Sequence, residues 1–200
     1  MQNKTPIFYD EQQQKRLITA LEEAVGKTDG KICHEITSEY VHTDTLVLGD
    51  TGEEMVFATF GMSARRQNTP LPLFERVELM AFTAEEPEAD ADKLLICSEL
   101  CRISKYPFRE DSWLGLGHTM DACAQMKERF GYAYYAFLGP VLTADVDGEG
   151  DVFYLALVPL YKEEWDWIVQ HDTFEFFDAY TKKHGDLHFC IDQVREKFIP

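Results

Sequence analysis

Residues 41–82 read VHTDTLVLGDTGEEMVFATFGMSARRQNTPLPLFERVELMAF and contain most of three runs of apolar, β-branched and aromatic side chains. The runs cover residues 40–48, 55–62 and 76–82. The turn sequence GDTG separates the first two, and a loop with two prolines, residues 63–72, separates the last two. Such runs between glycine- or proline-containing turns are typical of sequential antiparallel strands. This stretch therefore predicts a three-stranded antiparallel meander.

The segments next to the meander predict the helices and strands that cover and extend it. A capping box at Asp10 and Gln13 predicts a helix at residues 11–25, in an N-terminal region that extends to residue 30. Acidic residues around Pro87 predict the start of a second helix, which continues to Ile103 and ends at Pro107. Apolar runs at residues 132–142 and 152–160, joined by an acidic turn, predict two more strands.

The C-terminal part predicts two further helices, one after residue 160 and one that begins at Asp172, which forms a capping-box pattern with Glu175. Residues 187–191 predict an edge strand, and residues 194–198 predict a terminal helical turn. Together these elements predict an α+β fold, with a largely antiparallel or mixed central sheet covered by helices. At 200 residues and 45% apolar content, the chain is expected to form one domain over residues 1–200.

The chain carries 19 basic and 36 acidic side chains, which give a formal charge of −17. This charge disfavours binding to nucleic acid and to anionic membranes, and it attracts a basic protein partner. The alternative is that it serves solubility alone. Five cysteines are an odd number and lack the density of a disulfide framework, and no secretion signal or long apolar run is present. We therefore expect a cytoplasmic, soluble protein with reduced thiols.

Several short motifs occur in one order along the chain. They are HxD at His42 and Asp44; TxGMS ending with Gly61, Met62 and Ser63; RVEL, which contains Arg76 and Glu78; Trp113 followed by Gly117 and His118; and VPL, which contains Pro159, followed by Glu163. In this order the chain resembles the Suppressor of fused (SUFU) domain family over about residues 40–180.

The resemblance implies a protein-binding module without a catalytic centre or a cofactor. The animal protein that gives the family its name sequesters transcription factors in Hedgehog signalling, whereas many small bacterial relatives are encoded beside polymorphic toxins and are thought to act as immunity proteins. This chain lacks the length of the second lobe of the animal protein, so the Hedgehog role is not transferred. The expectation is a bacterial, single-domain immunity protein that binds a basic cognate toxin stoichiometrically and is not an enzyme.

The motif residues also allow other interpretations. His42 and Asp44 lie two apart on one strand face, and they could line a cleft or form a structural hydrogen bond. Arg76 and Glu78 could clamp a ligand carboxylate or pair with each other and with neighbouring strands. A small hydrolase would use His42, Asp44, Glu78 and His118 as acid and base groups in one pocket.

The remaining candidates are aromatic side chains and thiols. Trp113 and Trp167 would serve as interface anchors if they are exposed. A chaperone-like module would instead bind extended peptides along an open sheet edge. Cys97 and Cys101 stand one helical turn apart, so they could provide half of a metal site or be buried thiols. No metal is expected.

Overall fold

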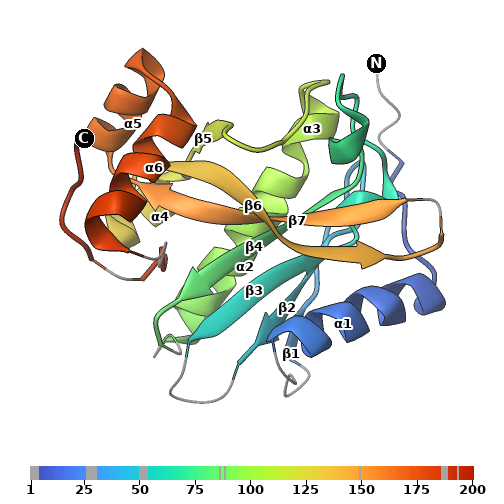
Figure 1. The fold of residues 1–200 in the computed structure, drawn as a ribbon. Coiled ribbons are helices and arrows are strands. Elements are labelled where there is room, and N and C mark those ends of the chain that lie inside the picture. The colour runs from blue at the N-terminus through green and yellow to red at the C-terminus, as the bar shows by residue number, and fades with distance from the viewer. Residues whose placement is uncertain are drawn as a thin grey trace.

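A computed structural model describes residues 5–25, 31–49, 54–85, 87, 89–148, 150–185, 189–192 and 194–200. Its centre is a seven-stranded sheet in the order β1-β2-β3-β4-β7-β6-β5 (Figure 1). The strands are β1 (Lys31–Cys33), β2 (Asp44–Leu48), β3 (Met55–Phe60), β4 (Val77–Thr83), β5 (Thr119–Asp121), β6 (Tyr134–Asp145) and β7 (Asp151–Leu160).

The helices are α1 (Glu11–Val25), α2 (Asp90–Ser104), α3 (Tyr106–Arg109), α4 (Ala124–Phe130), α5 (Lys162–Gln170) and α6 (Thr173–His184), with short 3₁₀ helices η1 (Met62–Ala64) and η2 (Pro72–Phe74). α1 and α6 begin where the sequence predicts. The main-chain N–H of Gln13 donates to Asp10 Oδ1 at 2.8 Å, and that of Phe174 donates to Asp172 Oδ1 at 2.7 Å. Each side chain thus satisfies a donor that the first helical turn leaves without a partner.

The predicted meander is confirmed. β2 pairs with β3 and β3 with β4, both antiparallel, with Thr45 opposite Thr59 and Ala58 opposite Met80. β4 then pairs with β7 in parallel, while β7 pairs with β6 in a long antiparallel hairpin. The sheet is therefore mixed, and β1 and β5 form its two edges.

Alternate residues of the strands pack on opposite faces of the sheet. Phe57, Leu79 and Leu155 belong to one buried cluster, which also contains apolar side chains of α2. Ala58, Met80 and Tyr154 belong to a second cluster, under α1. β3 is buried along its whole length because helices cover both of its faces, as its continuous apolar sequence predicts (Figure 1).

The structure corrects the predictions at both ends of the second helix and in the C-terminal segment. α2 begins at Asp90, after Pro87, and Pro107 lies inside the separate helix α3. Of the predicted edge strand at 187–191, residues 187 and 188 lie outside the described residues. Residues 189–191 form no strand and bond to β4 only through the N–H of Ile191, which donates to Phe82 O at 2.8 Å.

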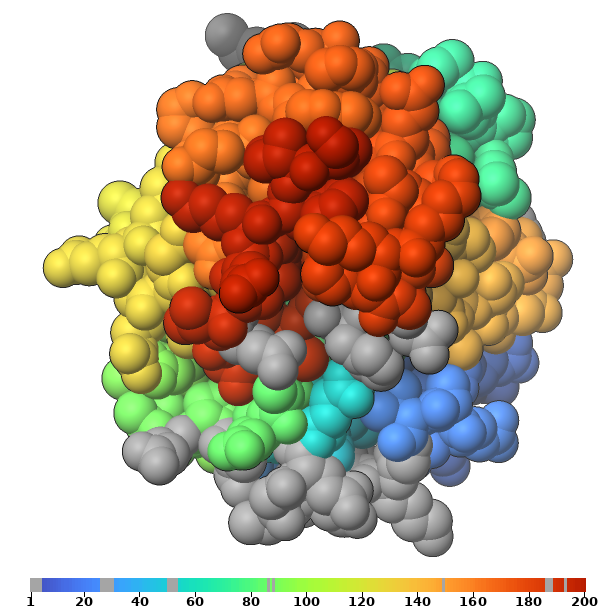
Figure 2. All heavy atoms as spheres, turned by 60° about the vertical axis from the view of Figure 1, so that its left-hand side comes forward, coloured from blue at the N-terminus to red at the C-terminus, as the bar shows by residue number. Residues whose placement is uncertain are grey.

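The predicted helical turn at residues 194–198 is also wrong, because this segment is irregular and is bound by side chains of α5 and α6. Arg195 donates to Glu164 with both terminal nitrogens, one at 2.7 Å, and the N–H of Phe198 donates to the same carboxylate at 2.9 Å. The ring of Phe198 is buried against Phe176 and Tyr180. In Figure 2 the C-terminal residues, in dark red, lie against α5 and α6.

Candidate functional site

The motif residues occupy four places, and the first is a buried carboxylate. Glu78, on β4, is 0% exposed and accepts hydrogen bonds from the main chain of Gly61 and Ser63 and from the hydroxyls of Ser63 and Thr59, at 2.5–2.9 Å. Burial raises the pKa of Glu78, and these hydrogen bonds oppose the rise. The TxGMS motif thus forms a cradle for a carboxylate. Met62 of the same motif is buried and belongs to the core cluster on the α2 side of the sheet.

Gly61 is required in this cradle for steric reasons. Its φ of 119° is unfavourable for other residues, and an added Cβ would lie 2.1 Å from the main-chain oxygen of His42. Since that oxygen belongs to the backbone, it cannot rotate away. The glycine therefore lets the end of β3 approach the His42 segment closely enough to wrap around Glu78.

Arg76 does not pair directly with Glu78; its main partner comes from the β6–β7 turn. Its guanidinium forms a two-point contact with Asp147, at 2.7 and 2.9 Å, and donates to Tyr9 Oη at 2.9 Å. Tyr9 Oη in turn lies 2.9 Å from Ser63 Oγ. We call Tyr9, Ser63, Arg76, Glu78 and Asp147 the Glu78 cluster. Its bonds join the N-terminal segment, β4 and the β6–β7 turn.

The second place is a network of polar side chains in which His42 and Asp44 pair with each other. His42 Nε2 lies 3.0 Å from Asp44 Oδ1, and His34 Nδ1 lies 3.0 Å from Asp44 Oδ2. Nearby, Lys105 Nζ donates to Glu35 Oε2 at 2.8 Å. Asp44 is only 5% exposed, so these bonds chiefly satisfy a buried carboxylate.

The third place is the loop before β5. Trp113 packs its ring edge-on against His118 at 4.2 Å between centroids and stacks with Phe74. Burial lowers the pKa of His118, and a hydrogen bond with the main chain of Trp113 opposes this only in part. The lowered pKa favours the neutral form of the His118 imidazole. An added Cβ on Gly117, whose φ is 77°, would lie 2.9 Å from the Phe174 ring.

The outer edge of β5 points its main-chain groups away from the sheet. The N–H of Ala122 bonds to Ala133 O and that of Phe137 bonds to His118 O, so the intervening Met120 also faces β6. Alternation then directs the N–H and C=O of Thr119 and Asp121 outward. Arg102, which donates to Asp121 O at 2.8 Å, confirms this direction.

Aromatic side chains surround this edge. Trp165 donates from Nε1 to Thr119 Oγ1 at 3.1 Å and stacks on Tyr134 at 4.1 Å. Phe174 is 53% exposed and lies beside Gly117. We call Trp113, His118, Trp165 and Phe174, together with the outward main chain of β5, the β5 rim.

The last motif residues lie near the C-terminal segment. Pro159 is buried on β7, and its carbonyl accepts from Arg195 at 3.1 Å. Glu163 pairs with Lys197 at 2.6 Å on the surface, and Trp167 is half-buried and stacks on His171 at 4.0 Å. The expectation that Trp113 or Trp167 is an exposed anchor stays a prediction, since both rings are partly covered.

The structure brings His42 and Asp44 together but places Glu78 and His118 with other partners. Four donors surround Glu78, and His118 packs on Trp113. This arrangement does not resemble the convergent acid–base set that a hydrolase requires. Among the described residues, no group of three or more His, Cys, Asp or Glu side chains could hold a metal ion. Nor is any described helix long and apolar enough to cross a membrane.

Several residues of these clusters could not be selected from the sequence. Tyr9, His34, Glu35, Asp147 and Arg195 lie outside the motifs, and the motif residues or Glu164 that they bind are between 9 and 71 positions away. The RVEL motif indicates that Arg76 and Glu78 are charged residues on one strand face, but not which residues they bind. Trp165 and Phe174 resemble ordinary helix residues until the sheet order places them beside β5.

The mixed sheet, covered by α1 and α2 and carrying an accessible edge strand, defines an α+β domain whose buried polar groups brace the scaffold. The chain belongs to the family described as Suppressor of fused protein (SUFU), which matches residues 40–192. None of the curated proteins compared with it matches.

Solved structures share the fold at low sequence identity. A SUFU homologue from Neisseria gonorrhoeae is 13% identical and superposes with a TM-score of 0.64, covering 90% of this chain and 94% of that one. The Sufu–Fu complex gives 9% identity and a TM-score of 0.61, covering 87% of this chain and 86% of that one. Drosophila Suppressor of Fused gives 11% and 0.57, and the match covers 90% of this chain but 48% of that protein.

Proposed function

We propose that this chain is a non-enzymatic protein-binding module, and that it acts as an immunity protein that neutralises a basic toxin by stoichiometric binding. The observation that carries the proposal is the β5 rim. Arg102 already bonds to the C=O of Asp121, but the outward N–H and C=O of Thr119 and the N–H of Asp121 can pair with a further strand. Aromatic side chains beside β5 provide contacts for the side chains of the added segment.

Charge supports a basic partner. The formal charge of −17 attracts a cationic protein and raises its association rate, since opposite net charge steers the encounter. Sufu, whose fold this chain shares, has been solved in complex with a protein, Fu. The match with the N. gonorrhoeae homologue covers 94% of that protein, which supports the proposal that a domain of this size binds its partner without a second lobe.

The open edge also supports a second candidate, a chaperone-like module that binds many extended peptides. The two functions differ in selectivity. An immunity protein binds one partner with one-to-one stoichiometry, whereas a chaperone-like module also binds unrelated extended peptides with similar affinity.

The test uses the product of the neighbouring reading frame, expressed with and without this chain. The proposal predicts a one-to-one complex and restored growth of cells that express the product. Asp121→Pro removes an outward N–H without removing a β5–β6 bond, and we expect it to weaken binding at least about tenfold. Asp121→Ala, the control, removes only the side chain and should bind nearly as the wild type does.

Three outcomes would decide against parts of the proposal. If the two proteins neither associate nor restore growth, the immunity role is wrong. Equal binding by Asp121→Pro and wild type would exclude the β5 edge. Comparable binding of unrelated extended peptides would favour the chaperone-like module.

A further inference from the structure

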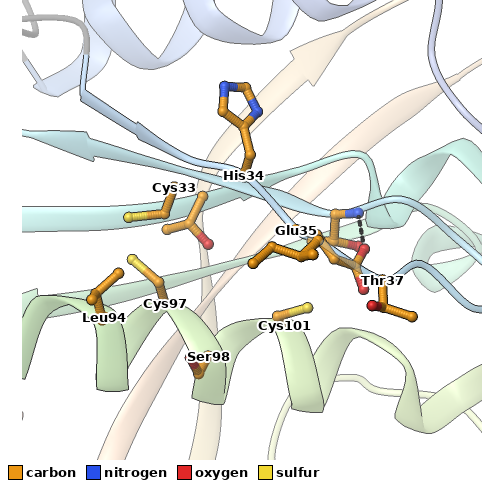
Figure 3. A pocket seen from close by; sticks show the side chains of 11 residues that line it. Cys33, His34, Glu35, Thr37, Leu94, Cys97, Ser98 and Cys101 are labelled. Atoms are coloured by element: carbon orange, nitrogen blue, oxygen red, sulfur yellow. Dashed lines mark hydrogen bonds between the residues drawn. The ribbon is translucent and has the colours of Figure 1, made fainter. Parts of the chain in front are cut away.

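A cavity of about 320 Å³ lies between β1 and α2, at the sheet edge opposite β5. Three of the five cysteines line it: Cys33 from β1, and Cys97 and Cys101 from successive turns of α2 (Figure 3). The structure describes all five as free thiols. Neither the SUFU motifs nor the β5 rim includes any of these three.

The strand alternation directs Cys33 toward α2. Cys33 is opposite Thr45 and packs against the buried cluster of α2, whereas its neighbour Ile32 packs against the cluster of α1. Cys33 packs against the buried cluster that contains Cys97, and both side chains line the cavity. Figure 3 shows these two sulfur atoms on facing sides of the cavity.

Cys101 has a different neighbour. It lines the cavity together with Glu35, whose Oε2 accepts a hydrogen bond from Lys105 at 2.8 Å. Among the three thiols, the geometry therefore favours one pair, which joins the edge strand to the helix.

We propose that Cys33 and Cys97 are a modification site, at which a peroxide oxidises the two thiols to a disulfide that links β1 to α2. In the first step, the Cys33 sulfur attacks one peroxide oxygen; the O–O bond breaks, and Cys33 becomes a sulfenic acid with release of one water from hydrogen peroxide. In the second step, the Cys97 sulfur attacks the Cys33 sulfur; the S–O bond breaks, and the hydroxide takes the thiol proton and leaves as water. Two thiols are oxidised and one peroxide is reduced to two waters.

Burial sets the order of these steps. Cys33 is half-buried, whereas Cys97 is only 6% exposed, so the peroxide reaches Cys33 first. Burial raises the pKa of Cys97 above its usual range, and it raises the pKa of Cys101 to about 12. Both thiols stay protonated at neutral pH, which protects them from solvent oxidants. Cys97 therefore reacts only when the hydroxide that leaves the adjacent sulfenic acid takes its proton.

The disulfide would restrict an edge strand of only three residues. It closes a long loop from β1 to α2, which reduces the conformational freedom of the unfolded chain and raises thermal stability. Because β1 and β5 are opposite edges of the sheet, oxidation should leave binding at the β5 rim unchanged. The inference is thus independent of the proposed function.

The test treats the reduced full chain with hydrogen peroxide, blocks the remaining thiols with N-ethylmaleimide and maps the peptides by mass spectrometry without reduction. We expect a Cys33–Cys97 linked peptide and a higher melting temperature, both reversed by dithiothreitol. Cys33→Ser and Cys97→Ala should abolish the linkage. Cys101→Ser and Cys190→Ser, the controls, should retain it.

The wild-type peptide map decides the question even if Cys97→Ala folds poorly. The proposal is overturned if no linked peptide forms, if another pair predominates, or if the linkage forms as fast in urea-unfolded chain as in folded chain. Retention of the linkage in Cys33→Ser would also contradict it.

Discussion

The hydroxyl of Tyr9 lies 2.9 Å from that of Ser63 and accepts a hydrogen bond from Arg76 at the same distance. Because the Ser63 hydroxyl donates to Glu78, Tyr9 must donate to Ser63. The bonds therefore run in one direction, from the Arg76 cation through two hydroxyls to the Glu78 carboxylate. This series of hydrogen bonds attaches the N-terminal segment to the sheet.

Tyr9→Phe keeps the ring and removes the hydroxyl that links Ser63 to Arg76. We expect a loss of about 1–2 kcal/mol in the free energy of unfolding, because two buried groups each lose a partner. Urea denaturation measures the loss. Tyr134→Phe is the control, since its ring stacks on Trp165 in both forms. Equal stability of Tyr9→Phe and wild type would show that the hydroxyl chain does not brace the fold.

Glu78→Gln should be more damaging than Tyr9→Phe. The amide nitrogen of glutamine cannot accept the hydrogen bonds that one carboxylate oxygen now accepts, so buried donors of Gly61, Ser63 or Thr59 lose their partner. We expect a loss of about 3 kcal/mol in urea denaturation. Glu75→Gln changes a more exposed ion pair with Arg66 and should cost less than about 1 kcal/mol. Similar costs for the two variants would contradict the role of the cradle.

The acid side of the stability curve should depend on Asp92. The Arg129 guanidinium lowers the pKa of this carboxyl through two hydrogen bonds, at 2.6 and 2.7 Å. Because the folded-state pKa lies below the unfolded value of about 4, the contribution to stability is present above about pH 4 and is lost as the pH falls through the folded-state pKa.

Asp92→Asn should therefore flatten the fall in stability below about pH 4, measured as melting temperature against pH. High salt should reduce the difference between variant and wild type, because Arg129 is exposed. Asp90→Asn is the matched control, since its side chain is 97% exposed in the same helical turn. If both variants follow the wild-type curve, the Asp92–Arg129 pair does not contribute.

The meander and the helix starts could be predicted because their causes are local. Turn residues bound the strands, and Asp10 and Asp172 cap helices within three residues. The parallel pairing of β4 with β7 has no local signal, since residues 84–150 separate the two strands. The TxGMS motif forms the carboxylate cradle locally. Its connection to Tyr9, in contrast, depends on how distant segments of the chain come together, as the pairing of β4 with β7 does.

The C-terminal prediction failed for a related reason. Val194 and Phe198 have the spacing of a helix, yet Val194 is 84% exposed and Phe198 is 4% exposed. The buried Glu164 binds Arg195 and the Phe198 N–H, and this holds the segment in an irregular conformation. The contact of Arg195 with Glu164, 31 positions away, thus overrides the helical spacing of this segment.

Gly117→Ala tests whether the β5 rim depends on the position of Phe174. The new methyl group would lie 2.9 Å from that ring and displace it, so binding of the partner should weaken in titration calorimetry. Gly148→Ala is a close control, because its φ of 76° matches the 77° of Gly117 and no described residue beyond its chain neighbours lies within 4 Å of the added methyl group. Both variants should lose about 1–2 kcal/mol of stability to backbone strain. Unchanged binding by Gly117→Ala would exclude Phe174 from the interface.

Arg195→Ala should destabilise the fold because it leaves the Glu164 carboxylate, which is 0% exposed, without its cation. The guanidinium also lies within 6 Å of the ring centroids of Tyr161, Tyr180 and Phe189, so its removal leaves a gap in the packing of the C-terminal segment. We expect a loss of about 3–5 kcal/mol in urea denaturation.

Lys197→Ala removes a neighbouring cation whose pair with Glu163 is about half exposed, and it should change stability little. The double variant Glu164→Gln/Arg195→Ala should recover part of the loss, since no buried charge then remains. If the double variant is no more stable than Arg195→Ala, the loss comes from packing of the segment and not from the unpaired carboxylate.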